Sequence, residues 1–108
     1  MDDTPKFITT TSELERVIKT LCEFEAIAID TEFIRESTYY AQLCLIQLAA
    51  GEHYFAIDPL SKNLNLSPLF EMLDNTNIVK VFHAGRQDIE IFVHLTGKVP
   101  NPIFDTQI

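Results

Sequence analysis

Two carboxylates with a single residue between them are the strongest chemical signal in this sequence. Asp30 and Glu32 follow an apolar run at residues 26–29, and residues i and i+2 of an extended strand point to the same face. Like charges this close repel, so each carboxylate tends to keep its proton unless a cation lies between them. Mg²⁺ and Mn²⁺ prefer such oxygen ligands. The pair therefore predicts a metal site, although an acidic loop at a strand end would carry the same residues without any function.

A third carboxylate lies on the apolar side of a predicted helix. At about 100° per residue, the polar side chains of residues 86–96 gather in one sector, and Asp88 falls outside it, beside Phe92 and Leu95. A carboxylate that faces a core must be paired or bound to a metal. The alternative is an acid that stabilises the first turn through the helix macrodipole. That alternative explains the position of Asp88 along the helix but not the face it occupies.

Aromatic side chains near these acids could contact a substrate. His83 follows an apolar strand at residues 78–82, where it could bind a substrate or a phosphate. Phe33, Tyr39 and Tyr40 could line a cleft, and a base could stack on one of them. The competing interpretations are a loop histidine held by backbone groups and aromatic residues of the core. We take His83 and Phe33 as the substrate-binding candidates.

The apolar pattern predicts the elements that position these residues. Strands are expected at residues 6–9, 26–33, 39–50, 53–57 and 78–82 and from 103 onward, and helices at 11–22, 67–73 and 86–95. The strand at 39–50 is apolar on both faces and should be central, and Gly51 with Glu52 forms a hairpin turn after it. Three strands joined by tight turns, followed by alternating helices and strands, indicate an α/β protein with a mixed sheet flanked by helices.

Cap signals place the helix ends. Thr11 and Ser12 can cap the first helix, and Glu15 completes a capping box if Ser12 is the cap. Pro68 suits the first turn of the second helix. Gly97 is expected to end the third helix.

Composition bounds the classes of function. The chain has 108 residues, of which 46% are hydrophobic and 22% charged, so it can form one small domain with a core. A formal net charge of −8 argues against a simple nucleic-acid-binding module. It does not exclude an enzyme that reaches nucleic acid through bound cations. With three glycines in all, the sequence contains no glycine-rich phosphate loop.

The cysteines and the apolar runs indicate a compartment. Cys22 and Cys44 lie in apolar surroundings without metal-type spacing, which predicts buried free thiols in a reducing environment. The sequence begins without a signal-peptide stretch, and its apolar runs are too short to span a bilayer. We therefore expect a cytoplasmic protein with no membrane partner.

Four segments, in this order, resemble ribonuclease D, a branch of the DEDD superfamily of 3′–5′ exonucleases. Residues 26–33 (AIAIDTEF) look like the first exonuclease motif, and residues 39–50 (YYAQLCLIQLAA) look like the strand after it. Residues 81–92 (VFHAGRQDIEIF) look like the second motif, and residues 104–108 (FDTQI) look like the next strand. Werner-type exonuclease domains share the first two motifs, but FHAG and FDTQI are more similar to ribonuclease D. The resemblance covers nearly the whole chain.

The resemblance implies a ribonuclease H-like fold and a 3′–5′ exoribonuclease that uses two divalent cations, Mg²⁺ or Mn²⁺. Its substrate would be RNA with a free 3′ end, in the family typically a tRNA precursor. By resemblance, Asp30 would ligate both cations, Glu32 one of them, and Asp88 the second. The family's third motif, with a Tyr and a final Asp, is absent, and we expect Asp105 to be structural. We interpret residues 1–108 as a partial exonuclease domain, truncated before its last helices.

Two hypotheses of different classes follow. As a fragment of an exonuclease, the chain should bind metal weakly and have negligible nuclease activity. The alternative is a non-catalytic, exonuclease-like binding or oligomerisation module, because truncation would leave a sheet edge and a helix-facing surface open to self-association. Replacing Asp30 by Asn separates the two hypotheses, since only the enzyme hypothesis predicts a loss of turnover in the parent protein.

Overall fold

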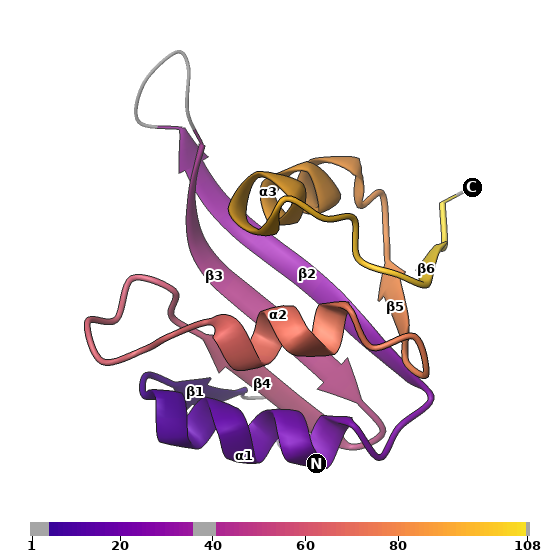
Figure 1. Cartoon of the computed structure of the whole chain (residues 1–108). Coiled ribbons are helices and arrows are strands. Elements are labelled where there is room, and N and C mark those ends of the chain that lie inside the picture. Colours follow the sequence, from indigo (N-terminus) through magenta and orange to yellow (C-terminus); the bar gives the residue numbers. More distant parts are fainter. Residues whose placement is uncertain (1–4, 36–40, 108) are drawn as a thin grey trace.

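The computed structural model describes residues 5–35 and 41–107, which form one six-stranded sheet and three helices (Figure 1). The strands are β1 (Lys6–Ile8), β2 (Ala26–Arg35), β3 (Ala41–Ala50), β4 (His53–Ile57), β5 (Val79–Phe82) and β6 (Ile103–Asp105). The helices are α1 (Thr11–Leu21), α2 (Ser67–Leu73) and α3 (Arg86–Thr96). Their order along the chain follows the prediction, while Tyr39 and Tyr40 lie outside the described residues.

The sheet is mixed, as the sequence predicted. Its strand order is β1-β4-β3-β2-β5-β6, so β3 and β2 occupy the centre. The run from β2 through β3 to β4 is antiparallel, whereas β1, β5 and β6 join their neighbours in parallel. Gly51, with a φ of 57°, makes the tight turn between β3 and β4. This architecture confirms the predicted ribonuclease H-like fold class.

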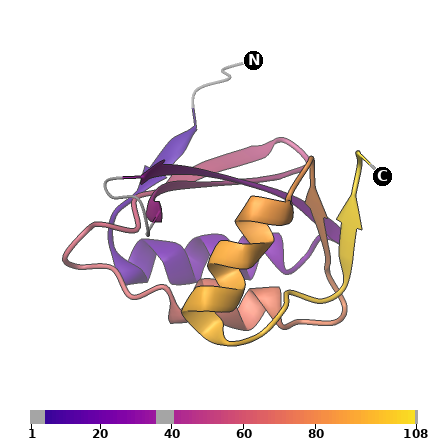
Figure 2. The ribbon, with the colours of Figure 1, turned by 90° about the horizontal axis from the view of Figure 1, so that it is seen from above.

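All three helices pack on one face of the sheet (Figure 2). The core lies between the helices and the sheet. On the strands, core side chains alternate with side chains that face outward. It includes Ile27, Ile29, Ile46 and Leu48 of the sheet and Leu14, Leu21, Leu69 and Phe92 of the helices. Within the described residues, no helix covers the other face of the sheet (Figure 2).

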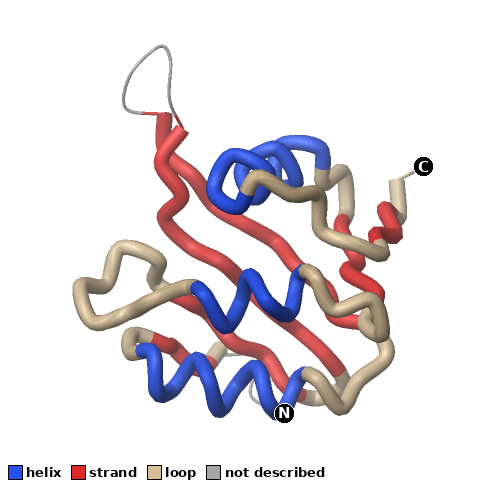
Figure 3. The backbone as a smooth tube through the Cα atoms, viewed as in Figure 1, coloured by secondary structure: helices blue, strands red, loops and turns tan. Residues whose placement is uncertain are grey.

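The central pair β2 and β3 extends beyond the rest of the sheet (Figure 3). β5 pairs with β2 only from Ala26 to Ala28. β3, in contrast, accompanies β2 as far as the pair Arg35 and Ala41, with a register shift after Glu32. The second half of β2 is therefore part of a two-stranded ribbon, and α3 lies beside this ribbon (Figure 1).

The first helix has its N-cap at Thr10, two residues before Ser12, which the predicted capping box would use. Its N-cap is Thr10, whose side chain accepts a hydrogen bond from the backbone N–H of Glu13. The carboxylate of Glu13 accepts in return from the Thr9 N–H at 3.3 Å. Thr11 is held by a distant loop, because its N–H donates to the Asn63 carbonyl at 3.1 Å. Thr11 is therefore bonded to the loop at residue 63 while Thr10 caps the helix.

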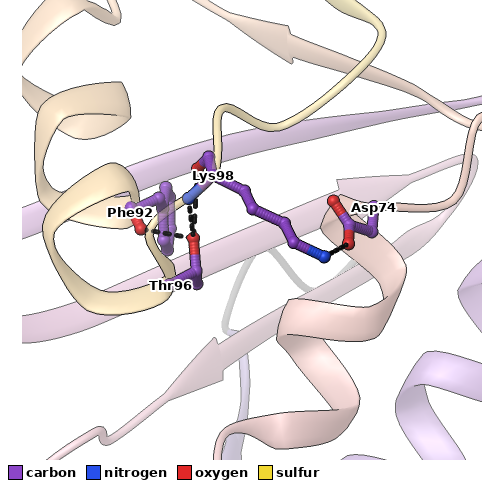
Figure 4. A network of polar contacts seen from close by, with 4 residues as sticks. All are labelled: Asp74, Phe92, Thr96 and Lys98. Carbon is purple, nitrogen blue, oxygen red and sulfur yellow. Dashed lines mark hydrogen bonds and ion pairs between the residues drawn. The ribbon is translucent and has the colours of Figure 1, made fainter.

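The C-terminal end of α3 is fixed to α2 through side chains (Figure 4). The Thr96 hydroxyl donates to the Phe92 carbonyl at 2.8 Å and accepts from the Lys98 N–H at 3.1 Å. The Lys98 ammonium then pairs with Asp74, at the end of α2, at 3.0 Å. Gly97 ends the helix in the left-handed conformation, with a φ of 75°, as the sequence predicted. These contacts join the end of α3 to the end of α2.

A buried lysine connects the loops that precede β5 and β6. Lys80 of β5 is fully inaccessible to solvent, and its ammonium donates to the backbone carbonyls of Asn75 and Asn101. Burial lowers the pKa of Lys80, although the charge of Asp74 opposes this effect. The lysine thus joins the loop before β5 to the loop before β6.

The prediction of two buried thiols is wrong, because neither cysteine is buried. Both cysteines are free, but Cys22 is exposed and Cys44 is half-buried. Cys22 is the C-cap of α1, where the chain leaves the helix and turns away from the core. None of the helices in the described part of the chain is long and apolar enough to cross a bilayer.

Candidate active site

The acidic pair lies in the middle of β2, just beyond Ala28, the last residue that pairs with β5. Asp30 and Glu32 are both exposed on the face that the helices leave open. Thr31, between them, is 7% exposed and faces the helices. The alternation predicted from the sequence is confirmed here: the two acids share a face because they are two residues apart in a strand. Their carboxylates are accessible to a hydrated cation.

The third acid approaches the same strand from the opposite side. Asp88, in the first turn of α3, is 7% exposed, so the prediction that it faces the sheet is confirmed. The Thr31 hydroxyl donates a hydrogen bond to its carboxylate. Thr31 therefore stands between all three acids, with Asp30 and Glu32 as its neighbours along the strand and Asp88 against its side chain.

The surroundings of Asp88 disfavour its charged form. Burial raises the pKa of Asp88, and the negative charges of Asp30 and Glu32 raise it further, while the hydrogen bond from Thr31 partly offsets this rise. A cation near the three acids would act in the opposite direction and favour the ionised carboxylate.

The donor set suits a divalent cation in chemistry but only partly in position. Carboxylate oxygens are the ligands that Mg²⁺ and Mn²⁺ take. However, Asp30 and Glu32 lie on one face of β2, and Asp88 is bonded to Thr31 on the other. In residues 5–35 and 41–107, no group of three or more His, Cys, Asp or Glu side chains is arranged to hold a metal ion. That the three acids share cations remains a prediction.

The turn before α3 lies beside an open pocket of about 470 Å³ on the uncovered face of the sheet. Asp30 lines this pocket together with His83, Tyr54 and Thr106. The His83 ring nitrogen Nδ1 is hydrogen-bonded to the Thr106 hydroxyl at 2.7 Å, and the His83 side chain is exposed. Phe33, the other substrate-binding candidate, is half-buried and is not among the lining residues.

Sequence reasoning missed several residues that the structure brings to this site. Thr31 was not considered, although its position between two outward acids places it on the inward face that Asp88 also occupies. Gln47 pairs with Asp30 across β2 and β3, and its amide donates to the Tyr54 hydroxyl at 2.8 Å. Only a known strand register could have found that pair, because β4 brings Tyr54 next to β3.

Comparison with known proteins agrees with this geometry. The family model described as 3′–5′ exonuclease matches residues 5–108. Ribonuclease D of Bartonella henselae is 53% identical over 103 residues, which are 95% of this chain and 25% of that protein. Ribonuclease D of Escherichia coli is 47% identical over 103 residues, which are 95% of this chain and 27% of that protein. The chain thus spans about a quarter of the length of these relatives.

Solved structures carry the same fold. The crystal structure of E. coli RNase D, an exoribonuclease involved in structured RNA processing, superimposes with a TM-score of 0.88 at 45% identity, covering 96% of this chain and 28% of that one. The catalytic core of RRP6 from Trypanosoma brucei gives a TM-score of 0.84 at 30% identity, over 95% of this chain and 29% of that one. Because the family model matches nearly the whole chain, the chain belongs to the 3′–5′ exonuclease family. Its resemblance to ribonuclease D is confirmed by these relatives.

Proposed function

We propose that this chain supplies the N-terminal part of the site of a ribonuclease D, which removes nucleotides from RNA 3′ ends in the presence of divalent cations. The observation that carries the proposal is the position of Asp88, which is buried against Thr31 within electrostatic reach of Asp30 and Glu32. An acid in that environment is costly for a protein that binds no cation. The role of the E. coli relative in structured RNA processing supports RNA as the substrate.

The residues of the chain divide the work between two faces. Asp30 and Glu32 bind cations from the open side, where solvent and substrate have access. Asp88 contributes charge from the helix side, held in orientation by Thr31. When bound, a divalent cation lowers the pKa of its water and stabilises the oxygen that leaves. Bound cations would also let phosphates approach a chain whose formal net charge is −8.

Finer assignments belong to the same proposal. The pocket beside Asp30 is open to solvent and has His83 and Thr106 on its wall, so His83 would contact the 3′-terminal nucleotide or its phosphate. Phe33 is retained as a weaker candidate, because it is half-buried on the same strand. We propose tRNA precursors as substrates and the cytoplasm as the location. With Mn²⁺, the isolated 108-residue chain should leave a short RNA untrimmed, and robust 3′ trimming would contradict this expectation.

The test uses the full-length protein that contains this chain and a 5′-labelled, single-stranded RNA. Asp30→Asn should lower the rate about 100-fold or more, since charge stabilisation by a bound metal is worth several kcal/mol. Asp74→Asn is the matched control: this exposed aspartate pairs with Lys98 far from the acids, and turnover should be unchanged. A second RNA with a blocked 3′ end should resist degradation. If Asp30→Asn retains full turnover, the proposed cation site is wrong, whereas a full-length protein that trims no RNA at all would support the non-catalytic hypothesis.

The choice of substrate has a test of its own. A tRNA precursor with a short 3′ trailer should be shortened to the mature end faster than an unrelated structured RNA with the same single-stranded extension. Equal rates on both RNAs would contradict the assignment to tRNA, while leaving the exonuclease proposal intact.

A further inference from the structure

The end of β6 holds the turn that precedes α3. The carboxylate of Asp105 accepts hydrogen bonds from the backbone N–H groups of Ala84, at 3.0 Å, and Gly85, at 2.8 Å. It also accepts from the N–H of Gln107 at 3.0 Å. These bonds hold the pKa of Asp105 below its ordinary value, so the group is charged when it makes them. One side chain from the sheet edge thus fixes two consecutive amides of the turn.

Local preferences do not specify this turn. Ala84 has a φ of 53°, a left-handed conformation that residues with a side chain rarely adopt. At Gly85, a Cβ would lie 2.4 Å from the Cβ of Phe82, so no side chain fits there. Gly85 is the N-cap of α3 and makes no side-chain cap bond. Asp105 of β6 instead accepts from the N–H groups of Ala84 and of the N-cap residue Gly85 itself.

The turn leads directly into the candidate site. Asp88 is the third residue after Gly85, and the first helical turn is closed by the bond from the Ile89 N–H to the Gly85 carbonyl at 2.8 Å. Because these backbone bonds are short and continuous, a displacement of Gly85 moves Asp88 with it. The negative charge of Asp105 also lies at the positive end of the helix macrodipole.

The neighbouring residue fixes the other side of the turn. The Thr106 hydroxyl is hydrogen-bonded to His83, and the Thr106 N–H donates to the Phe82 carbonyl at 2.9 Å. Residues 82–85 are therefore held by Asp105 and Thr106 through separate contacts. Asp105 acts on the end of the turn that starts α3, whereas Thr106 acts on the end that carries His83. This separation allows the two effects to be tested independently.

We propose that Asp105 is a positioning residue of the exonuclease site, whose carboxylate sets the turn at residues 83–85 and thereby the place of Asp88 relative to Asp30 and Glu32. The inference rests on the proposed function, because it assumes that Asp88 serves the cations. Asp105 binds neither cation nor substrate in this scheme. Its loss should change how the site responds to metal more than it changes how tightly RNA is held.

The experiment compares Asp105→Asn with the unaltered full-length protein. Asn has nearly the same volume, and its single oxygen can keep the two bonds of Oδ1, while its NH₂ group would face the Gly85 N–H. Turnover should fall about 10- to 100-fold, the effect of a misplacement of about 1 Å in a site. The KM for RNA should stay close to that of the unaltered protein, and the Mn²⁺ concentration for half-maximal activity should rise. Asp105→Ala should lower turnover further and raise the Mn²⁺ concentration for half-maximal activity further.

Two control variants separate positioning from general destabilisation. Asp58→Asn alters another loop aspartate, whose carboxylate accepts the Leu60 N–H at 2.9 Å after β4. It should lower the melting temperature by weakening a carboxylate–amide bond but leave the Mn²⁺ dependence unchanged. Thr106→Val removes the bond to His83 and should raise the KM without shifting the Mn²⁺ dependence. A shift in Mn²⁺ dependence with Thr106→Val as large as with Asp105→Asn would overturn the inference.

The two proposals fail in different ways. If Asp105→Asn is folded and keeps the turnover and the Mn²⁺ dependence of the unaltered protein, Asp105 has no positioning role, and the exonuclease proposal stands. If Asp30→Asn retains full turnover, the proposed cation site fails first, and this inference fails with it. Should Asp105→Ala not fold, the nearly isosteric Asn variant still decides the question.

Discussion

The hydrogen bond between Thr31 and Asp88 gives the sharpest test of how the third acid is held. Both residues are 7% exposed, and the Thr31 hydroxyl donates to the Asp88 carboxylate. Thr31→Val keeps the volume and the branched shape of the side chain and removes only this donor. The buried carboxylate then loses a bond of the charge-assisted kind, which is worth about 1.5–3 kcal/mol. We expect Thr31→Val to lower the free energy of unfolding by roughly 2 kcal/mol at neutral pH.

A double-mutant cycle isolates this bond from other effects of the substitution. The free energy of unfolding would be measured by urea denaturation for Thr31→Val, Asp88→Ala and the double variant. Residues in direct contact have coupling energies of about 0.5–3 kcal/mol, and we expect a value in the upper half of that range. Thr31→Ser is the matched control. It keeps the hydroxyl and loses one methyl group, which costs about 1 kcal/mol, but it should preserve activity and metal dependence.

The outcome that would refute this reasoning is a coupling energy below about 0.5 kcal/mol. In that case Thr31 and Asp88 would be neighbours without energetic connection. The same conclusion would follow if Thr31→Ser impaired nuclease activity of the full-length protein as strongly as Thr31→Val, because only the Val variant lacks the donor.

Three further predictions concern buried groups. Asp88→Asn should raise the free energy of unfolding at neutral pH. The folded pKa of Asp88 lies above its ordinary 3.8, so the ionised acid costs stability above that folded pKa, and the cost disappears as the pH falls. The gain from the substitution, measured by urea denaturation, should therefore shrink in acid. Gly85→Ala should cost about 1–3 kcal/mol by overpacking, because a Cβ there meets Phe82 at 2.4 Å, and the melting temperature would reveal it. Lys80→Met should cost about 1–3 kcal/mol through its lost bonds to two carbonyls. Because the folded pKa of Lys80 lies below 10.5, the original chain, unlike the Met variant, should also gain stability as the pH rises toward that value.

The sequence predicted best where a single periodicity decides the structure. Alternation along β2 placed Asp30 and Glu32 on one face, and the helical period placed Asp88 on the inner side of α3. Both follow from local geometry, which needs no knowledge of the neighbours. The pairing of the two patterns through Thr31 could have been predicted as well, because the residue between two outward acids must point inward.

Features that depend on distant contacts could not be predicted. Two overlapping capping boxes fit the sequence, one at Thr10 and one at Ser12, and the structure has Thr10 as the N-cap, with the next residue, Thr11, bonded to the distant loop carbonyl of Asn63. Asp105 was expected to be structural, since nothing near it in sequence indicates that its carboxylate reaches the amides of Ala84 and Gly85. Cys22 was expected to be buried because its neighbours are apolar, but the end of α1 turns it outward.

The strand β2 changes its pairing partners along its length. Its residues 26–28 pair with β5, Ala28 also pairs with β3, and Ile27 lies in the core. Its later residues, including Glu32, keep a partner only in β3. Asp30 and Glu32 are exposed whereas Ile27 and Ile29 are buried, so a lineage could alter the two acids while the scaffold survives. Inactive descendants of this architecture should therefore differ first beyond Ile29 and retain the hydrophobic residues before it.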